Sequence, residues 1–258
     1  MSVLDKIILN KKKEIKISKS IKSINLIKKS LFFNKEVISL KKFLVERSGV
    51  ISEFKRKSPS KPSINLNADI NKVVLGYEEA NSSAISILTD NLFFGGTRED
   101  ITSLREKITI PILRKDFIID EYQVFESKSL GADAILLIAS CLSVNDVEKL
   151  SSLAKSLGLE TILEVHSKEE LKYLNENIDI VGVNNRNLTL FKTDINNSIN
   201  LSKHIPKRVF KISESGISSL NHIIKLKKCG YKGFLIGENF MKSDNPSRAC
   251  KNFINLIK

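Results

Sequence analysis

A short apolar segment at residues 50–54 ends in two charged side chains. Its valine, isoleucine and phenylalanine residues are typical of a strand, and Glu53 and Lys55 stand two positions apart. Because side chains two apart lie on the same face of a strand, both should point the same way. Opposite charges that face a core are costly unless something there needs them. With a Ser-Pro-Ser loop following at residues 58–60, the segment indicates the mouth of an α/β barrel, where catalytic groups gather.

Charged side chains also stand at the ends of three later apolar segments. Lys115 occurs in PILRKDF, Glu164 in TILEVH and Glu214 in FKISESGI. Together with Glu53 and Lys55 they would share one cavity, and such crowding shifts their pKa values. A lysine among carboxylates stays protonated and can act as an acid, while a less tightly paired glutamate can act as a base. A structural ion-pair network remains an alternative for each residue alone, but the whole set favours an active site.

Two short glycine-containing turns indicate an anion site. Ser215-Gly216 follows the Glu214 segment, Gly237-Glu238 follows the last apolar segment, and each precedes a predicted helix. Backbone N–H groups and the helix dipole at such positions hold phosphate, and this is the common phosphate site of (β/α)8 barrels. Two further polar side chains follow the preceding apolar segment in VGVNNRN, namely Asn184 and Arg186.

The elements that must position these groups alternate along the chain. Apolar runs predict eight strands, at residues 50–54, 84–88, 110–113, 133–138, 160–165, 179–183, 208–212 and 233–236. Helical periodicity predicts helices at residues 68–80, 97–107, 120–130, 143–157, 167–175, 195–203, 218–229 and 246–257. Continuous apolar strands suit a parallel sheet buried on both faces, and eight units in 258 residues favour a closed (β/α)8 barrel over a doubly wound sheet. We predict one domain, with a helical extension at residues 1–48 and the barrel at residues 49–258.

The net charge of +13 raises nucleic acid or an anionic membrane as a partner. Residues 1–48 hold 12 lysines and one arginine against four acids, whereas the other 210 residues carry only +4. No aromatic residues interleave with the lysine runs at 11–13, 28–29 and 41–42, as single-strand binding would require. We therefore interpret the runs as solvated helix faces and expect no nucleic acid or membrane partner. A phosphorylated small-molecule substrate would also suit a positive field.

The remaining composition indicates a cytoplasmic protein. The chain has no apolar run long enough to cross a bilayer, and its N-terminus lacks the pattern of a secretory signal. Its three cysteines are far apart and form no CxxC motif, which predicts neither disulfides nor a zinc site. His166 has no second ligand at metal spacing, so we expect no metal and no cofactor.

Several long motifs resemble the indole-3-glycerol phosphate synthase family of tryptophan biosynthesis. They are VLDKIILNKKKEI, ISEFKRKSPS, AISILTDNLFFGGT, PILRKDFIIDEYQVFESKSLGADAILLIAS, EVHSKEEL, GVNNRNL, SESGI and LIGENFM, in the family's order. The resemblance implies a (β/α)8 barrel with an N-terminal helical segment over the active-site mouth. It also implies a carboxy-lyase, which closes 1-(2-carboxyphenylamino)-1-deoxy-D-ribulose 5-phosphate to indole-3-glycerol phosphate with loss of CO2 and water.

The resemblance also implies roles for individual residues. Lys115 resembles the general acid that protonates the ketone oxygen, and Glu164 the base of the later steps. Glu53 and Lys55 resemble a pair that positions the substrate and assists proton transfer. Asn184 and Glu214 resemble polar contacts to substrate hydroxyls and to the catalytic lysine. The remaining positions resemble the family's apolar wall and substrate- and phosphate-binding residues: Phe117, Arg186, Ser58, Ser215, Gly216, Gly237 and Glu238.

Three positions depart from the family pattern, and two other functions stay open. Pro62 follows SPSK where glycine is typical, Leu190 stands where threonine is frequent, and Asn239 replaces a common serine. One alternative is a sugar-phosphate isomerase of tryptophan or histidine biosynthesis, although such enzymes rely on a Cys or Asp pair at strand ends. The other is a nucleic-acid-binding protein that uses the basic N-terminal segment. We expect a monomer, with at most weak contact to other enzymes of the tryptophan pathway.

Overall fold

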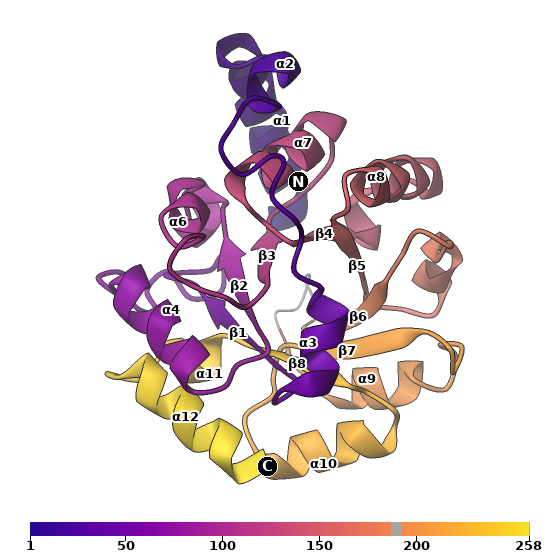
Figure 1. Cartoon of the computed structure of the whole chain (residues 1–258). Coiled ribbons are helices and arrows are strands. Elements are labelled where there is room, and N and C mark those ends of the chain that lie inside the picture. Colours follow the sequence, from indigo (N-terminus) through magenta and orange to yellow (C-terminus); the bar gives the residue numbers. More distant parts are fainter. Residues whose placement is uncertain (187–191, 258) are drawn as a thin grey trace.

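Eight parallel strands close into a barrel in chain order in the computed structural model, which describes residues 1–186 and 192–257 (Figure 1). The strands are β1 (Val50–Phe54), β2 (Ala84–Leu88), β3 (Ile112–Lys115), β4 (Ala134–Ile138), β5 (Glu160–Val165), β6 (Ile180–Asn184), β7 (Phe210–Glu214) and β8 (Gly233–Ile236). β1 pairs with both β2 and β8, which closes the sheet. The predicted (β/α)8 barrel is thus confirmed.

Helices cover the outside of the barrel and cap its two ends (Figure 1). The α-helices are α1 (Val3–Ile21), α2 (Ile24–Ile27), α3 (Leu40–Glu46), α4 (Ile70–Glu79), α5 (Asn91–Phe94), α6 (Glu99–Thr102), α7 (Glu121–Leu130), α8 (Val144–Ser156), α9 (Asn196–Leu201), α10 (Leu220–Lys228), α11 (Glu238–Met241) and α12 (Pro246–Ile257). Two 3₁₀ turns add η1 (Ala139–Cys141) and η2 (Glu169–Tyr173). No described helix is both long and apolar enough to cross a membrane.

The third strand lies two residues later than predicted. The Ile85 N–H bonds to the carbonyl of Pro111, and the pairing continues until the Thr89 N–H bonds to the carbonyl of Lys115. Lys115 is therefore the last residue of β3 and not a loop residue. The predicted helix at 97–107 contains only the one-turn α6, and that at 167–175 contains only η2.

The pleat of the strands divides the core into two layers. Outward side chains such as Val50 and Phe54 pack with the helices, whereas inward ones such as Ile51, Ile162 and Ile212 fill the barrel. Because side chains alternate along each strand, the next inward position on β1, β5 and β7 is a glutamate. These glutamates, and Lys115 and Asn184 on their own strands, lie at or next to the carboxyl ends of the strands.

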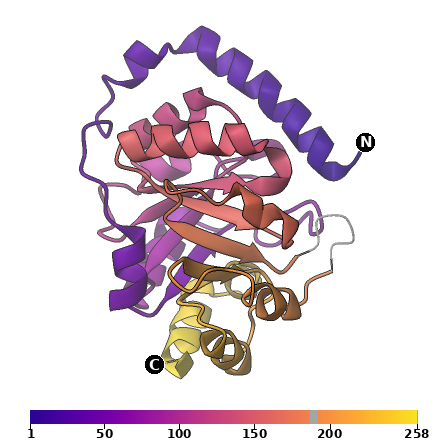
Figure 2. The same ribbon diagram turned by 90° about the vertical axis from the view of Figure 1, so that its right-hand side faces the viewer.

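The N-terminal extension covers both ends of the barrel: the start of α1 lies over the mouth, as predicted, and α3 lies at the other end. Figure 2 shows α1 along the outside, with its N-terminus toward the carboxyl ends of the strands and α3 at the opposite end. Leu40 and Leu44 of α3 belong to the apolar cluster inside the barrel, together with Ile51 and Leu235. α3 thus closes the amino-terminal end of the barrel.

The extension is also less helical than predicted, and barrel carboxylates hold the chain just before α3 and at its start. Between α2 and α3 the chain forms turns and an irregular stretch. Asp133 accepts a hydrogen bond from the Ile38 N–H at 2.8 Å. Glu160 accepts one from the Ser39 hydroxyl at 2.5 Å and another from the Lys41 N–H at 2.9 Å. These bonds fix the start of α3 to the barrel.

Candidate active site

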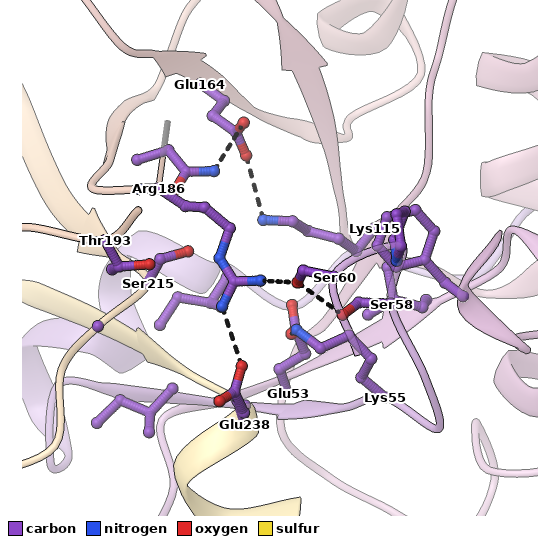
Figure 3. A pocket seen from close by; sticks show the side chains of 18 of the residues that line it. Glu53, Lys55, Ser58, Ser60, Lys115, Glu164, Arg186, Thr193, Ser215 and Glu238 are labelled. Atoms are coloured by element: carbon purple, nitrogen blue, oxygen red, sulfur yellow. Dashed lines mark hydrogen bonds and ion pairs between the residues drawn. The ribbon is translucent and has the colours of Figure 1, made fainter. Parts of the chain in front are cut away.

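A cavity of about 330 Å³ opens at the carboxyl ends of the strands (Figure 3). Of the sequence-predicted site residues, all but one line it: Glu53, Lys55, Ser58, Lys115, Phe117, Glu164, Asn184, Arg186, Ser215, Gly216, Gly237 and Glu238. The exception is Glu214, which is fully buried and contacts Lys115. The structure thus brings together residues from six strands that are far apart in sequence.

Lys115 is held between two buried carboxylates. Its Nζ lies 2.5 Å from Oε2 of Glu214 and 3.2 Å from Oε2 of Glu164. Burial opposes the positive charge, but Glu214 and Glu164 outweigh it and raise the pKa of Lys115. Asn184 donates from Nδ2 to the other oxygen of Glu164 at 3.1 Å, so Glu164 is oriented from two sides. Lys115 is therefore a protonated acid whose direction is fixed.

The pKa values of the two glutamates shift in opposite directions although both contact Lys115. Burial raises the pKa of Glu164, but Lys115, His166 and Asn184 together lower it below the ordinary value. Burial raises the pKa of Glu214 to about 7, and the nearby Glu164 adds to the rise against the opposing effect of Lys115. Two acids around one lysine leave one negative charge uncompensated, so the fully buried Glu214 is the acid that takes up a proton more readily.

Glu53 and Lys55 form a second pair on the opposite wall. Their side chains point the same way, as predicted, and Lys55 Nζ lies 2.5 Å from Oε1 of Glu53. Burial opposes ionisation of Glu53, but Lys55 and Lys115 lower its pKa. A Cβ on Gly237 would lie only 2.9 Å from the Cβ of Glu53, so the glycine leaves room for this carboxylate.

Ionic contacts join the loops around the rim. Arg186 donates from one guanidinium nitrogen to the Ser60 hydroxyl at 2.7 Å and from the other to Glu238 at 2.9 Å (Figure 3). Lys61 Nζ lies 2.6 Å from the second oxygen of Glu238. The loop after β1 is therefore tied across the mouth to residues after β6 and β8. Ser215 adopts φ 67°, a left-handed conformation that is uncommon outside glycine and often marks functional sites.

The apolar wall includes residues that the sequence did not indicate. The rings of Phe117 and Phe94 pack at a centroid distance of 6.0 Å. Phe94 also lines the cavity. Further lining residues without a sequence signal are Val3, Leu4 and Ile7 of α1, together with Ser60 and Thr193. Local patterns do not show which α1 residues reach the cavity; only the family resemblance placed the N-terminal segment over the mouth.

His166 stays close to the acids without forming a metal site. Its Nε2 lies 3.6 Å from Oε1 of Glu164, and its Nδ1 lies 3.8 Å from Glu170. Across residues 1–186 and 192–257 no cluster of three His, Cys, Asp or Glu side chains is arranged to hold a metal ion. Of the three departures from the family pattern, Pro62 is exposed and Asn239 lines the cavity. Leu190 lies outside the described residues.

Comparison with known proteins decides between the open alternatives. The family model of indole-3-glycerol phosphate synthase matches residues 4–253. The chain belongs to this family. Indole-3-glycerol phosphate synthase of Bacteroides thetaiotaomicron is 45% identical over 99% of both chains. That of Caldanaerobacter subterraneus subsp. tengcongensis is 41% identical over 97% of this chain and 94% of its own. That of Bacillus cereus is 42% identical over 95% and 94%.

Solved structures of lower identity confirm the fold alone. A tryptophan synthase α-subunit from Pyrococcus furiosus has a TM-score of 0.62 at 16% identity, covering 82% of this chain and 98% of its own. The 3-hexulose-6-phosphate synthase of Salmonella typhimurium has a TM-score of 0.62 at 14% identity, covering 81% and 97%.

The reaction follows from the family. The protein is a lyase that closes 1-(2-carboxyphenylamino)-1-deoxy-D-ribulose 5-phosphate to indole-3-glycerol phosphate, with release of CO2 and water. As an indole-3-glycerol phosphate synthase it serves tryptophan biosynthesis. The alternative of a sugar-phosphate isomerase with the same fold was wrong. The strand ends supply glutamates and lysines for this ring closure, and not the Cys or Asp pair on which such isomerases rely.

Proposed function

We propose that Lys115 is the general acid of ring closure and that Glu164 is the base of the later dehydration. The observation that carries this assignment is the ammonium group of Lys115 in the cavity wall, kept protonated by Glu164 and Glu214. A ketone is a weak electrophile, and a proton donor fixed at its oxygen stabilises the charge that develops there.

The steps balance with these two residues and the second ion pair. The ring carbon that bears the carboxylate bonds to the ketone carbon, while the ketone oxygen takes the proton of Lys115 and becomes a hydroxyl. CO2 then leaves, and the electrons of its bond restore the aromatic ring. Glu164 removes a proton from the carbon next to nitrogen as the hydroxyl departs. The Lys55–Glu53 pair supplies the proton that converts the departing hydroxyl into water.

Substrate recognition divides between an anionic side and an apolar side of the cavity. Backbone N–H groups at Gly216, Gly237 and Glu238 bind the phosphate together with the hydroxyls of Ser58 and Ser215. The Glu238 carboxylate does not repel the phosphate, since Lys61 and Arg186 neutralise it. Phe117 packs on the anthranilate ring, Lys55 faces an anionic group, and Asn184 contacts a substrate hydroxyl.

Two substitutions separate the proposed acid from the proposed base. In Lys115→Ala, consumption of substrate should fall by about 10²- to 10⁴-fold, because no acid activates the ketone. In Glu164→Gln, single turnovers should release CO2 faster than the indole fluorescence of the product appears, because dehydration alone is slowed. Lys149→Ala serves as the control, since this lysine is exposed and lies on α8.

Stopped-flow fluorescence and CO2 release on the same samples measure both effects. Rapid substrate consumption by folded Lys115→Ala contradicts the role of the acid. Equal slowing of CO2 release and fluorescence in Glu164→Gln contradicts the role of the base. Circular dichroism shows whether each variant is folded.

A further inference from the structure

Lys11 is a buried lysine that the reaction steps above do not use. It lies on α1 within the first lysine run and is 2% exposed, so the interpretation of that run as a solvated face is wrong at this position. Its Nζ lies 2.7 Å from Glu14, 2.9 Å from Asp116 and 3.1 Å from Asp90. Burial opposes the charge, but Asp116 and Asp90 raise the pKa of Lys11. A buried ammonium group is stable only when acidic partners compensate its charge, and here these partners come from α1 and from two loops.

The two aspartates belong to loops that carry the cavity wall. Asp116 stands between Lys115 and Phe117, and its carboxylate also accepts the Phe117 N–H at 2.8 Å. Asp90 caps α5 by accepting the Phe93 N–H at 2.9 Å, and the same short helix ends in Phe94 of the wall. These two carboxylates therefore fix the backbone next to Lys115 and next to the aromatic pair Phe94–Phe117.

Lys11 joins these two loops to a third part of the wall. Val3, Leu4 and Ile7 lie one to two turns before it on α1 and line the cavity. Asp90 Oδ2 has no hydrogen-bond partner within the described chain apart from its ion pair with Lys11. Without Lys11, two buried carboxylates would face each other at the point where α1, the β2 loop and the β3 loop meet.

We propose that Lys11 is a positioning residue, which holds the first turn of α1 over the cavity and fixes the β3 loop that directs Lys115 and Phe117. It acts through Asp90 and Asp116 and does not touch the substrate. The inference rests on the function proposed for Lys115, because that lysine is the group whose direction Lys11 sets. The basic N-terminal segment thereby has a role within the active site.

The charged groups around the aspartate pair determine the expected pH response. Lys11 faces the pair from α1, where Glu14 also contacts Lys11, and Arg114 faces Asp116 from β3 at 3.1 Å. Beyond Arg114 lies Glu126 of α7. When the charge of Lys11 is removed, the two aspartates bind a proton more readily, because both carboxylates lie within hydrogen-bonding distance of the same Nζ and their like charges repel. Acidification then relieves the repulsion that Lys11 had balanced.

Three variants test the proposal. Lys11→Met keeps the length of the side chain without its charge, Lys11→Met with Asp90→Asn also removes the unbalanced carboxylate, and Lys12→Met is the control on the exposed face of the same helix. At pH 8 we expect kcat of Lys11→Met to fall at least tenfold, with a partial return at pH 6 relative to the wild type. The double variant should recover to within about threefold at pH 8, and Lys12→Met should match the wild type throughout.

Several results would overturn the proposal. Wild-type kcat and KM in folded Lys11→Met would do so, as would a loss that is equal at pH 6 and pH 8 and is not rescued by Asp90→Asn. If Lys11→Met does not fold at pH 8, the double variant decides: restored activity supports the role, and a folded but inactive double variant contradicts it. The result for Lys115→Ala is separate, because that variant can retain activity while the charge-dependent rescue of Lys11→Met still holds.

Discussion

At the scale of single residues, the site depends on the imbalance of two buried glutamates around one lysine. Glu214 is fully buried and Glu164 is 3% exposed, so water cannot stabilise the excess negative charge by solvation. Lys115 stays protonated under these conditions, and Glu214 is the group that responds to pH near neutrality. The site therefore keeps its acid charged over the whole physiological range.

The pH response of Glu214 predicts how stability changes with pH. Its pKa of about 7 in the folded protein exceeds the ordinary 4.5, so the folded state binds its proton more tightly than the unfolded chain. The resulting stabilisation is complete below pH 4.5 and is lost as pH rises through 7, and it amounts to a few kcal/mol. Urea unfolding of wild type and Glu214→Gln between pH 5 and 8 measures it. Identical pH slopes in the two proteins would contradict the prediction.

A glycine on the neighbouring strand makes room for the same carboxylate. Gly182 is the inward residue of β6 next to Asn184, and a Cβ there would overlap Oε1 of Glu214 and lie 3.1 Å from Ile162. Apolar side chains such as Ile162 and Ile212 fill the barrel interior below this carboxylate. The absence of a side chain at Gly182 thus allows Glu214 to take its position in the site.

We expect Gly182→Ala to lower kcat at least tenfold, because the methyl group moves Glu214 away from Lys115. Val181→Ala is the matched control, since Val181 lies on the same strand but packs outward with the helices. It should lower stability and leave kcat unchanged. Steady-state kinetics with thermal unfolding distinguishes the two, and an unchanged kcat in Gly182→Ala would count against the close packing.

At the scale of elements, the strands and the extension have separate tasks. The strand pleat delivers a charged inward residue at one end of the barrel and apolar ones below it. α3 closes the opposite end with Leu40 and Leu44, while the first turn of α1 reaches the mouth. One extension therefore serves stability at one end and the active site at the other.

Leu44→Ala should separate these tasks. Removal of a fully packed leucine side chain leaves a cavity and is expected to lower the free energy of unfolding by about 2–5 kcal/mol. Activity of the folded fraction should be unchanged, because Leu44 lies at the end remote from the cavity. Val45→Ala is the control, as its side chain is 64% exposed. Urea denaturation followed by circular dichroism measures the change; a loss of kcat without a loss of stability would contradict it.

At the scale of the whole molecule, the positive charge is spread over solvated lysines. Lys12, Lys13 and Lys16 on α1 are exposed, as are the lysine pairs at 28–29 and 41–42. Only Lys11 among the lysines of the three runs is buried. Exposed charges of this kind are screened by physiological salt and form no base-reading surface by themselves.

We predict a monomer that does not bind nucleic acid tightly. Sedimentation velocity should give the mass of one chain over a wide concentration range. Fluorescence anisotropy with labelled duplex and single-stranded DNA should show at most weak binding, which disappears at physiological salt. Tight binding with a steep salt dependence, or a stable dimer, would contradict this prediction.

Much of the fold and of the site could be predicted from the sequence, because the signals for them are local. Alternation and apolar runs located eight strands, and inward spacing on β1 predicted the Glu53–Lys55 pair. The residues that follow each strand could be listed before the fold was known, because parallel strands in a barrel all end at one face. Family motifs then narrowed the chemistry to one reaction.

Only the tertiary structure decided what depends on distant segments. The sequence could not show that Lys11 is buried while Lys12 is exposed, that Phe94 reaches the cavity, or that α3 closes the far end of the barrel. Periodicity describes which residues share a face but not what that face meets, because burial and ion pairing depend on parts of the chain that approach only after folding. For the same reason, the unequal pKa values of Glu164 and Glu214 emerge only when two strands place both acids against one lysine.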